Sequence, residues 1–265
     1  MKKISVLPLF LFFGLMANAQ TKEGRVVYER TIQMQMRLQG VSEEIAAQMP
    51  KSRTDVYELL FGNNQSLWQN LPTTNEDQNT FSGAGGNIVV SQRFNNEVVH
   101  YNFTTGKRTD LREVGDKNFL VDDSVHKLPW KISDETKTIL GHTARKATAA
   151  RIGTRPMVTM ENGQMKRSEV SDTSTIVAWF TTDIPVPAGP EVAGQLPGLI
   201  LELDINKGRI VYKAVELSPK VKLDAIKEPK GGKHITQAEY TAEQTKMFEN
   251  MRRNMPQGAQ IRIGN

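Results

Sequence analysis

The chain has 265 residues, no cysteine and a net charge of +5, from 34 basic and 29 acidic side chains. The absence of cysteine excludes disulfides, thiolate zinc sites, iron–sulfur clusters and cysteine nucleophiles. Beyond residue 20, no stretch approaches the roughly 20 apolar residues that a membrane helix needs. The length allows one or two domains of about 100–200 residues. Because no linker-like change in composition divides the chain, we expect a single domain over residues 20–265.

The first 19 residues have the features of a secretory signal peptide. Lys2 and Lys3 precede an apolar run over residues 4–16, and residues 17–19 (Ala-Asn-Ala) provide the small residues of a cleavage site. The apolar run is short for a membrane anchor. We therefore expect a cleaved signal peptide over residues 1–19. The mature protein is expected to be periplasmic or extracellular, and its first residue, Gln20, cannot carry a cysteine-linked lipid.

The charge of the mature chain is low and diffuse. Removing the two lysines of the signal peptide lowers the net charge from +5 to +3. The local basic cluster of Arg145, Lys146 and Arg151 is interpreted as the solvated face of strands. Such a distribution does not favour nucleic acid or an anionic membrane surface as a partner.

Most of the mature chain is predicted to form short strands separated by tight turns. In residues 24–38, apolar side chains such as Val26, Tyr28 and Ile32 alternate with polar ones, and Arg30 falls on the mostly apolar face. Asn-Gly and Asn-Asn pairs mark hairpin turns, and the Asn-, Thr- and Gly-rich residues 70–87 predict a loop. The predicted strands are 24–38, 56–61, 66–69, 88–94, 97–103, 107–114, 119–123, 130–132, 137–140, 144–152, 156–160, 164–170, 175–181, 199–205 and 209–217.

Strands joined by tight turns, without regular helices between them, favour an antiparallel sheet. We expect a mainly β fold with a single curved antiparallel sheet, either a barrel or a half-barrel, because about a dozen strands favour strong curvature. A short N-terminal helix is expected over residues 42–49. A C-terminal helix is expected over about residues 236–253, because Thr236 and Glu239 form a capping-box pattern. Its expected apolar stripe is Ala238, Ala242, Thr245 and Phe248 or Met251.

The segment from Trp179 to Leu203 combines apolar residues with three prolines. Pro185, Pro187 and Pro190 predict a stiff, extended connection that cannot join the middle of a sheet. Residues 196–199 fit a type II turn, with a positive φ expected at the glycine. Two interpretations stay open: the segment fills one end of the sheet core, or it lines the rim of a cleft.

Known catalytic and metal-binding motifs are absent from the sequence. No Gly-x-Ser-x-Gly, His-Glu-x-x-His, Walker or dinucleotide-binding pattern occurs. We predict no catalytic residue, no metal and no cofactor. Glu202 and Asp204 share one strand face, which is typical of the solvent side of an amphipathic strand. The four histidines, none at the spacing of a helical metal pair, are His100, His126, His142 and His234.

Residues 195–200, Gln-Leu-Pro-Gly-Leu-Ile, resemble the signature of the GLPGLI family, secreted proteins of Bacteroidetes. Residues 130–142 resemble the upstream block of that family, and residues 178–190 resemble its middle block. Two positions differ: Gln195 replaces the first glycine of the signature, and Ala144 stands where the family often has a cysteine. A thiol role is therefore excluded for this chain.

The resemblance implies a secreted protein of a family without an established activity. The upstream block is also similar to that of LolA-like periplasmic proteins, which bind lipid or other hydrophobic material in an open half-barrel. This similarity implies a fold and does not by itself imply a function.

We hypothesise a non-enzymatic binding or cell-envelope accessory protein whose apolar cleft holds a lipid, a peptide or an outer-membrane partner. The oligomeric state is left open. The residues expected to contact the ligand are Trp130, Trp179, Phe180, Leu196, Pro197, Gly198, Leu199 and Ile200.

Two alternatives are kept. In the first, the protein is an interaction module of an outer-membrane or secretion complex, and the exposed side chains of Met247, Phe248 and Met251 dock onto a partner. In the second, it is an envelope hydrolase. The residues available for hydrolysis are Asp183, Glu202, Asp204 and His142.

Overall fold

The computed structural model describes residues 21–33, 51–71, 80–83, 86–89, 97–161 and 164–253. These residues form mainly strands, with one 3₁₀ turn, η1 (Leu223–Ala225), and one α-helix, α2 (Gln237–Arg253). The strands are β1 (Gly24–Gln33), β2 (Ser52–Gly62), β3 (Gln65–Asn70), β4 (Thr80–Gly83), β5 (Gly86–Val89), β6 (Val98–Asn102), β7 (Lys107–Val114), β8 (Lys117–Ser124), β9 (Lys131–Ile139), β10 (His142–Glu161), β11 (Gln164–Thr181), β12 (Leu199–Ile205), β13 (Ile210–Ser218) and β14 (Lys233–Thr236).

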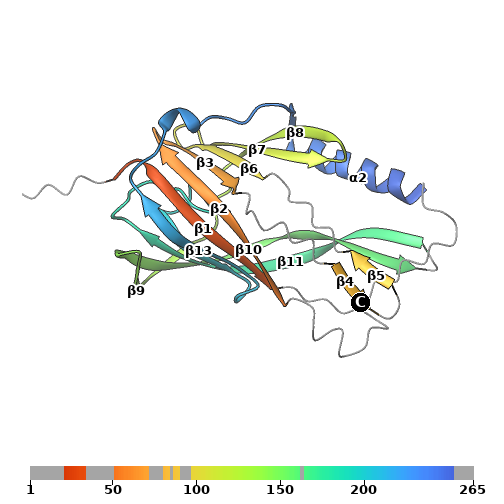
Figure 1. Ribbon diagram of the computed structural model, residues 1–265, viewed down its shortest axis with the longest axis horizontal. Coiled ribbons are helices and arrows are strands. Elements are labelled where there is room, and N and C mark those ends of the chain that lie inside the picture. Colours follow the sequence, from red (N-terminus) through yellow and green to blue (C-terminus); the bar gives the residue numbers. More distant parts are fainter. Residues whose placement is uncertain are drawn as a thin grey trace, which may run out of the picture.

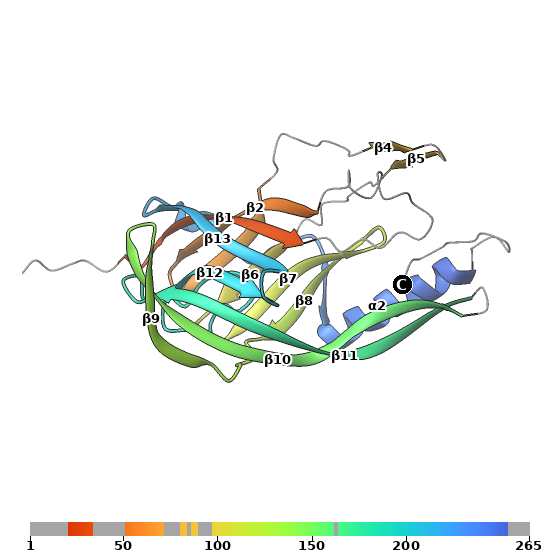
Figure 2. The same ribbon diagram turned by 90° about the horizontal axis from the view of Figure 1, so that it is seen from below.

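Twelve strands form one open sheet in the order β14-β8-β7-β6-β3-β2-β1-β13-β12-β11-β10-β9. The edge strands β14 and β9 do not pair with each other, so the sheet curves without closing (Figure 1, Figure 2). The mainly β fold with one large sheet is therefore confirmed. The expectation of a purely antiparallel sheet is wrong at its edge, where β14 runs parallel to β8. β8 and β14 lie far apart in the chain, which permits this pairing, since parallel neighbours need a crossover and not a hairpin.

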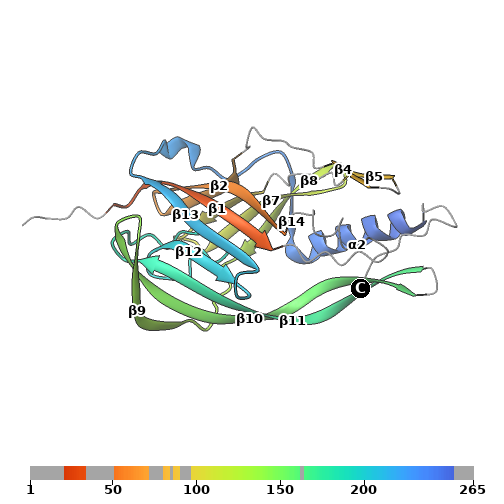
Figure 3. The same ribbon diagram turned by 60° about the horizontal axis from the view of Figure 1, so that its bottom comes forward.

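Three strands are longer than expected, because β9, β10 and β11 each join two predicted strands. β10 and β11 pair from Arg145↔Phe180 to Glu161↔Gln164 and form a ribbon that projects beyond the rest of the sheet (Figure 3). β9 accompanies β10 only as far as Thr148. Pro156 therefore falls on an edge strand, where a missing backbone N–H is tolerated.

Part of the region expected to be a loop is a hairpin. β4 and β5 pair with each other in a separate two-stranded sheet. The loop prediction for residues 70–87 is wrong here, because the β-propensity of Thr80, Phe81, Ile88 and Val89 outweighs the neighbouring glycines. The signal peptide at 1–19 and the expected helix at 42–49 lie outside the described residues, as does the part of the first expected strand beyond Gln33.

The concave face of the large sheet carries the main hydrophobic core. Val26 and Tyr28 of β1 and Leu201 and Leu203 of β12 are fully buried in it. Residues 182–198 cross this face and complete the core, which favours the core-filling interpretation of this segment. Its buried apolar side chains are Ile184, Val186, Ala188, Val192, Ala193 and Leu196.

The C-terminal part of the chain contacts both faces of the sheet. Residues 219–232 cover the outer face, where Ile226 packs on Leu60 and Leu67. α2 packs on the concave side through Tyr240, which contacts Phe119 and Ile235 (Figure 3).

The capping box that begins α2 is confirmed: the backbone N–H of Glu239 donates to Thr236 Oγ1 at 3.2 Å, and that of Thr236 donates to Glu239 Oε2 at 2.7 Å. The expected apolar stripe is wrong, since Ala238, Ala242 and Thr245 are exposed. The larger Tyr240 ring buries more apolar area and determines which side of the helix packs. No helix among the described residues has the length and apolar character to cross a membrane.

Candidate functional site

Charged side chains replace apolar ones on part of the concave face. Arg30 follows Tyr28 by two residues on β1 and therefore points to the same face, with Asp55 of β2 and Tyr212 of β13 directly opposite it. We name this set of residues the concave charged cluster. It consists of Arg30, Arg53, Asp55, Glu97, Arg108, Asp110, Arg112, Arg151 and Glu191.

Two buried aspartates each hold two arginines of the cluster. Asp55, 4% exposed, accepts hydrogen bonds from Arg30 Nη2 at 2.8 Å and Arg53 Nε at 2.6 Å. Asp110, also 4% exposed, accepts from Arg108 Nε at 2.6 Å and from Arg112 Nη2 at 2.5 Å. Each group therefore carries a net charge of +1 in a fixed geometry. The four arginine side chains remain 18–34% exposed.

Buried aromatic rings lie beneath Arg30. The ring of Trp68 lies 4.9 Å from that of Tyr57 and 5.8 Å from that of Tyr212. The guanidinium of Arg30 lies 4.6 Å from the Tyr57 ring centre, which is cation–π geometry. All three rings are buried. They therefore support the Arg30 guanidinium and do not present a free surface for stacking.

Two glutamates face this arrangement. Glu97 precedes β6, and its Oε2 lies 3.7 Å from Arg30 Nη1. Burial raises the pKa of Glu97, and the charge of Glu191 raises it further. Glu191 accepts a hydrogen bond from the Tyr212 hydroxyl at 2.8 Å, and its other oxygen lies 3.6 Å from Arg151 Nη1. Its φ of +57° is left-handed, which costs about 1–2 kcal/mol for a non-glycine residue.

The cluster offers fixed hydrogen-bond donors. Burial raises the pKa of Tyr57 to about 12 and raises the pKa of Tyr212 as well, so both phenols stay protonated at neutral pH. Guanidiniums that carboxylates hold in place match the planar geometry of an oxyanion. The arrangement can therefore bind and orient a polar, anionic ligand.

The energetics also distinguish this region as a candidate site. Desolvation offsets much of the attraction in buried ion pairs, and apolar side chains at such positions are often at least as stabilising. The same concave face carries a conventional apolar core a few residues away. Charges that are costly to bury, together with a glutamate of raised pKa, identify a candidate binding site.

The residues expected to contact a ligand lie elsewhere. Phe180, Leu196, Leu199 and Ile200 are at most 3% exposed in the main core. Pro197 is exposed. The ligand-binding role of these residues stays a prediction.

Both tryptophans among these residues are partly buried and contact polar or charged side chains. The Trp130 indole N–H donates to Gln195 Oε1 at 3.1 Å, and the Leu128 backbone N–H donates to the same oxygen at 2.9 Å. The side chain of Gln195, which replaces the signature glycine, thus links its own segment to that of Leu128 and Trp130. Trp179 lies under the ammonium of Lys137, 4.4 Å from its ring.

Gly198 is required because the backbone at residue 198 lies close to that of Thr181, and not because a turn needs a positive φ there. Its φ is not positive, so the expected type II turn at residues 196–199 is wrong. A Cβ at this position would lie 2.0 Å from the Thr181 carbonyl oxygen. The absence of a side chain therefore lets the segment pass directly against the end of β11.

The proline segment also borders a surface depression. Pro185, Val186 and Pro187 line an open volume of about 550 Å³ together with Asn63, Asn64, Lys22 and Glu23. The two interpretations of the segment are thus compatible, since its apolar side chains fill the core while two of its prolines line a depression.

The expected hydrolase residues do not form one catalytic group. His142 Nδ1 lies 3.1 Å from Asp183 Oδ2. Glu202 is engaged separately with Lys137 Nζ at 2.8 Å. Asp204 accepts the Gly208 backbone N–H at 2.6 Å and so stabilises the β12–β13 turn.

Three side chains of the C-terminal helix were expected to be exposed for docking, and the structure agrees with this only in part. Met247 is 46% exposed, whereas Phe248 is partly buried and engaged in contacts. The side chain of Met251 lies outside the described residues.

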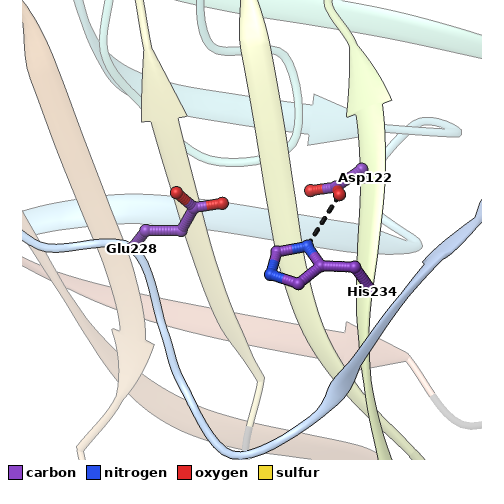
Figure 4. A group of neighbouring side chains, drawn as sticks. All are labelled: Asp122, Glu228 and His234. Carbon is purple, nitrogen blue, oxygen red and sulfur yellow. Dashed lines mark hydrogen bonds and ion pairs between the residues drawn. The ribbon is translucent and has the colours of Figure 1, made fainter.

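Asp122, Glu228 and His234 gather on the outer face of the sheet, with their potential ligand atoms within 4.8 Å of one another (Figure 4). His234 Nδ1 lies 2.7 Å from Asp122 Oδ2. The ammonium of Lys107 already lies 2.7 Å from Glu228 and 3.2 Å from Asp122, and its hydrogen bond lowers the pKa of Glu228. We interpret the group as a connection that holds residues 219–232 to β7 and β8.

The concave charged cluster was missed by sequence reasoning, although one signal was present. Arg30 interrupts an otherwise apolar alternation, and Asp55 and Asp110 become meaningful only once the strand pairing places them beside arginines. Glu191 reaches the cluster from a segment that crosses the sheet, which no local pattern indicates.

Comparisons with known proteins bear on the family and the fold. A family model described as a protein of unknown function (Porph_ging) matches residues 130–202. This range contains the residues on which the resemblance to the GLPGLI family rests, but the matching model bears another name, so that membership stays a prediction. No curated protein sequence matches the chain.

Solved structures of PNGF-II are similar to this chain. Structures of PNGF-II in space groups C2 and P21 superpose with TM-scores of 0.51 and 0.52 at 18% identity, and cover 85% of this chain. The aligned part is 33% and 34% of the PNGF-II chains, so this chain spans about a third of their length. Identity this low shows a shared fold alone.

Proposed function

We propose that the protein is an exported, non-enzymatic binding protein that holds a polar ligand at the concave charged cluster. One observation carries the proposal: two buried aspartates each fix two partly exposed arginines on the face of the sheet that otherwise forms the core. Rigid donors of this kind suit recognition, because little conformational entropy is lost when a ligand binds. The export part of the proposal rests on the signal-peptide pattern.

The proposed ligand differs in kind from the apolar one that the sequence favours. Leu196, Leu199 and Ile200 are packed against other protein side chains in the core. The arginines remain partly exposed on the same face. A polar ligand can therefore reach the cluster without displacing core residues.

The proposal is tested by native mass spectrometry of the protein purified gently from the periplasm of its own cells. We expect a bound small molecule on the wild type and at least tenfold less of it on Arg108→Gln. Arg25→Gln is the matched control, because Arg25 is 30% exposed and also contacts two carboxylates, those of Glu58 and Glu216, but on the opposite face. An empty wild type, or equal loss in both variants, would contradict the proposal.

A further inference from the structure

Glu191 occupies the cluster in the way an anionic ligand would. It belongs to the segment that crosses the concave face, whereas its two partners belong to separate strands, Tyr212 to β13 and Arg151 to β10. One carboxylate oxygen accepts from the phenol and the other faces the guanidinium. These are the contacts that an oxyanion makes with an arginine-based site.

Three features indicate that this contact can be exchanged. The Glu191 side chain is 33% exposed, so solvent and solutes reach it. The negative charge of Glu191 also repels that of nearby Glu97 and raises the pKa of Glu97. The apolar neighbours Val192 and Ala193 are buried, so the side chain can leave while the segment stays in place.

Resting on the binding function proposed above, we propose that the site takes a hydroxylated carboxylate, a uronate sugar being the simplest example, whose carboxylate replaces that of Glu191 between Arg151 and Tyr212. The arginines would bind the carboxylate, and the glutamate side chains of the cluster would accept hydrogen bonds from hydroxyls. The cluster lies on the face of the sheet. An extended peptide pairs its backbone with a free strand edge, whereas most residues of the cluster lie on β1, β2 and β7, which have neighbours on both sides, and this favours the sugar.

The test measures dissociation constants by isothermal titration calorimetry with galacturonate trimer, its neutral galactose counterpart and N-acetyl-glutamate amide. We expect Glu191→Gln to bind the galacturonate trimer at least fivefold more tightly than the wild type, because a competing carboxylate is lost. We expect Arg151→Gln to bind it at least fivefold more weakly. Glu135→Gln removes the same charge from a side chain that is 61% exposed and should match the wild type.

Each outcome of these binding measurements supports or overturns the proposal. Unchanged or weaker binding to Glu191→Gln, or equal affinity for the neutral trimer, overturns the replacement of Glu191 by a ligand carboxylate. Tighter binding of the glutamate derivative than of the galacturonate trimer overturns the sugar class. If thermal unfolding shows that Glu191→Gln is not folded, the affinity of Arg151→Gln for the galacturonate trimer alone decides whether the proposal stands. A native ligand without an acid group on the wild type would refute this inference while the binding function stands.

Discussion

A single missing Cβ lets the core-filling segment meet the end of β11. Gly198→Ala would place a methyl 2.0 Å from the Thr181 carbonyl oxygen, within backbone that cannot move cheaply. We expect a loss of about 1–3 kcal/mol or more in the free energy of unfolding, measured by urea denaturation. Gly153→Ala is the control, since nothing lies within 4 Å of its Cβ position, and it should be neutral or slightly stabilising. Similar losses in both variants would show that the contact at Gly198 is not responsible.

Glu97 should make stability depend on pH. Its pKa is raised above the ordinary 4.5, chiefly by burial. The folded state therefore holds the proton more tightly than the unfolded state, so this contribution to stability is complete below pH 4.5 and is lost as the pH rises through the raised value. Thermal unfolding of Glu97→Gln should show a higher melting temperature than the wild type at pH 7 and little difference at pH 4. A difference that is the same at both pH values, or a match to the exposed Glu135→Gln, would refute the assignment.

At the scale of elements, α2 depends on its first turn. The hydroxyl of Thr236 accepts the Glu239 N–H at 3.2 Å, and β14 ends at this residue. Thr236→Ala should lower the free energy of unfolding by about 0.5–2 kcal/mol and speed amide hydrogen exchange in the first turns of α2. Glu249→Ala, an exposed change with only a 3.9 Å ion pair to Arg253, should leave exchange there unchanged. Equal exchange in both variants would contradict the role of the cap.

Element prediction from the sequence succeeds where the signal is local. The alternation in β1 and the capping box of α2 depend on neighbouring residues, and the structure confirms them. The parallel pairing of β14 depends on a distant strand. The length of β10 depends on the pairing of Pro156 with Glu169 across the ribbon. Tertiary contacts decide such features, and no local pattern contains them.

The candidate site was largely beyond sequence reasoning for the same reason. Its members come from β1, β2, β7 and β10 and from the segments before β6 and β12, and their roles follow from cross-strand register. Arg30 on an apolar face was the one local indication. The sequence instead favours apolar residues of the proline segment as ligand contacts, because residues that fill a core and residues that line a cleft have the same apolar composition.

At the scale of the whole molecule, an open sheet must be held in its curve by contacts on its concave face. Its edges β14 and β9 do not pair, so no strand-to-strand closure fixes the curvature. Residues 182–198 and the buried aromatic rings provide the contacts that span the face. The same curvature brings Arg151 of β10 and Tyr212 of β13 to one carboxylate, so the geometry of the site depends on the curve of the sheet.

Tyr28 offers the most direct test of this dependence. Its hydroxyl donates to the Ile200 carbonyl at 2.6 Å, joining β1 to β12 across the intervening β13. Tyr28 is fully buried, so Tyr28→Phe leaves an acceptor without this donor and without water. We expect a loss of about 1–3 kcal/mol in the free energy of unfolding with an unchanged denaturant slope. Tyr240→Phe, whose hydroxyl lies 3.4 Å from the Glu113 carbonyl, should lose less, because that bond is long and weak. If the two variants lose the same amount, the hydrogen bond does not hold the curve, and packing of the rings alone must do so.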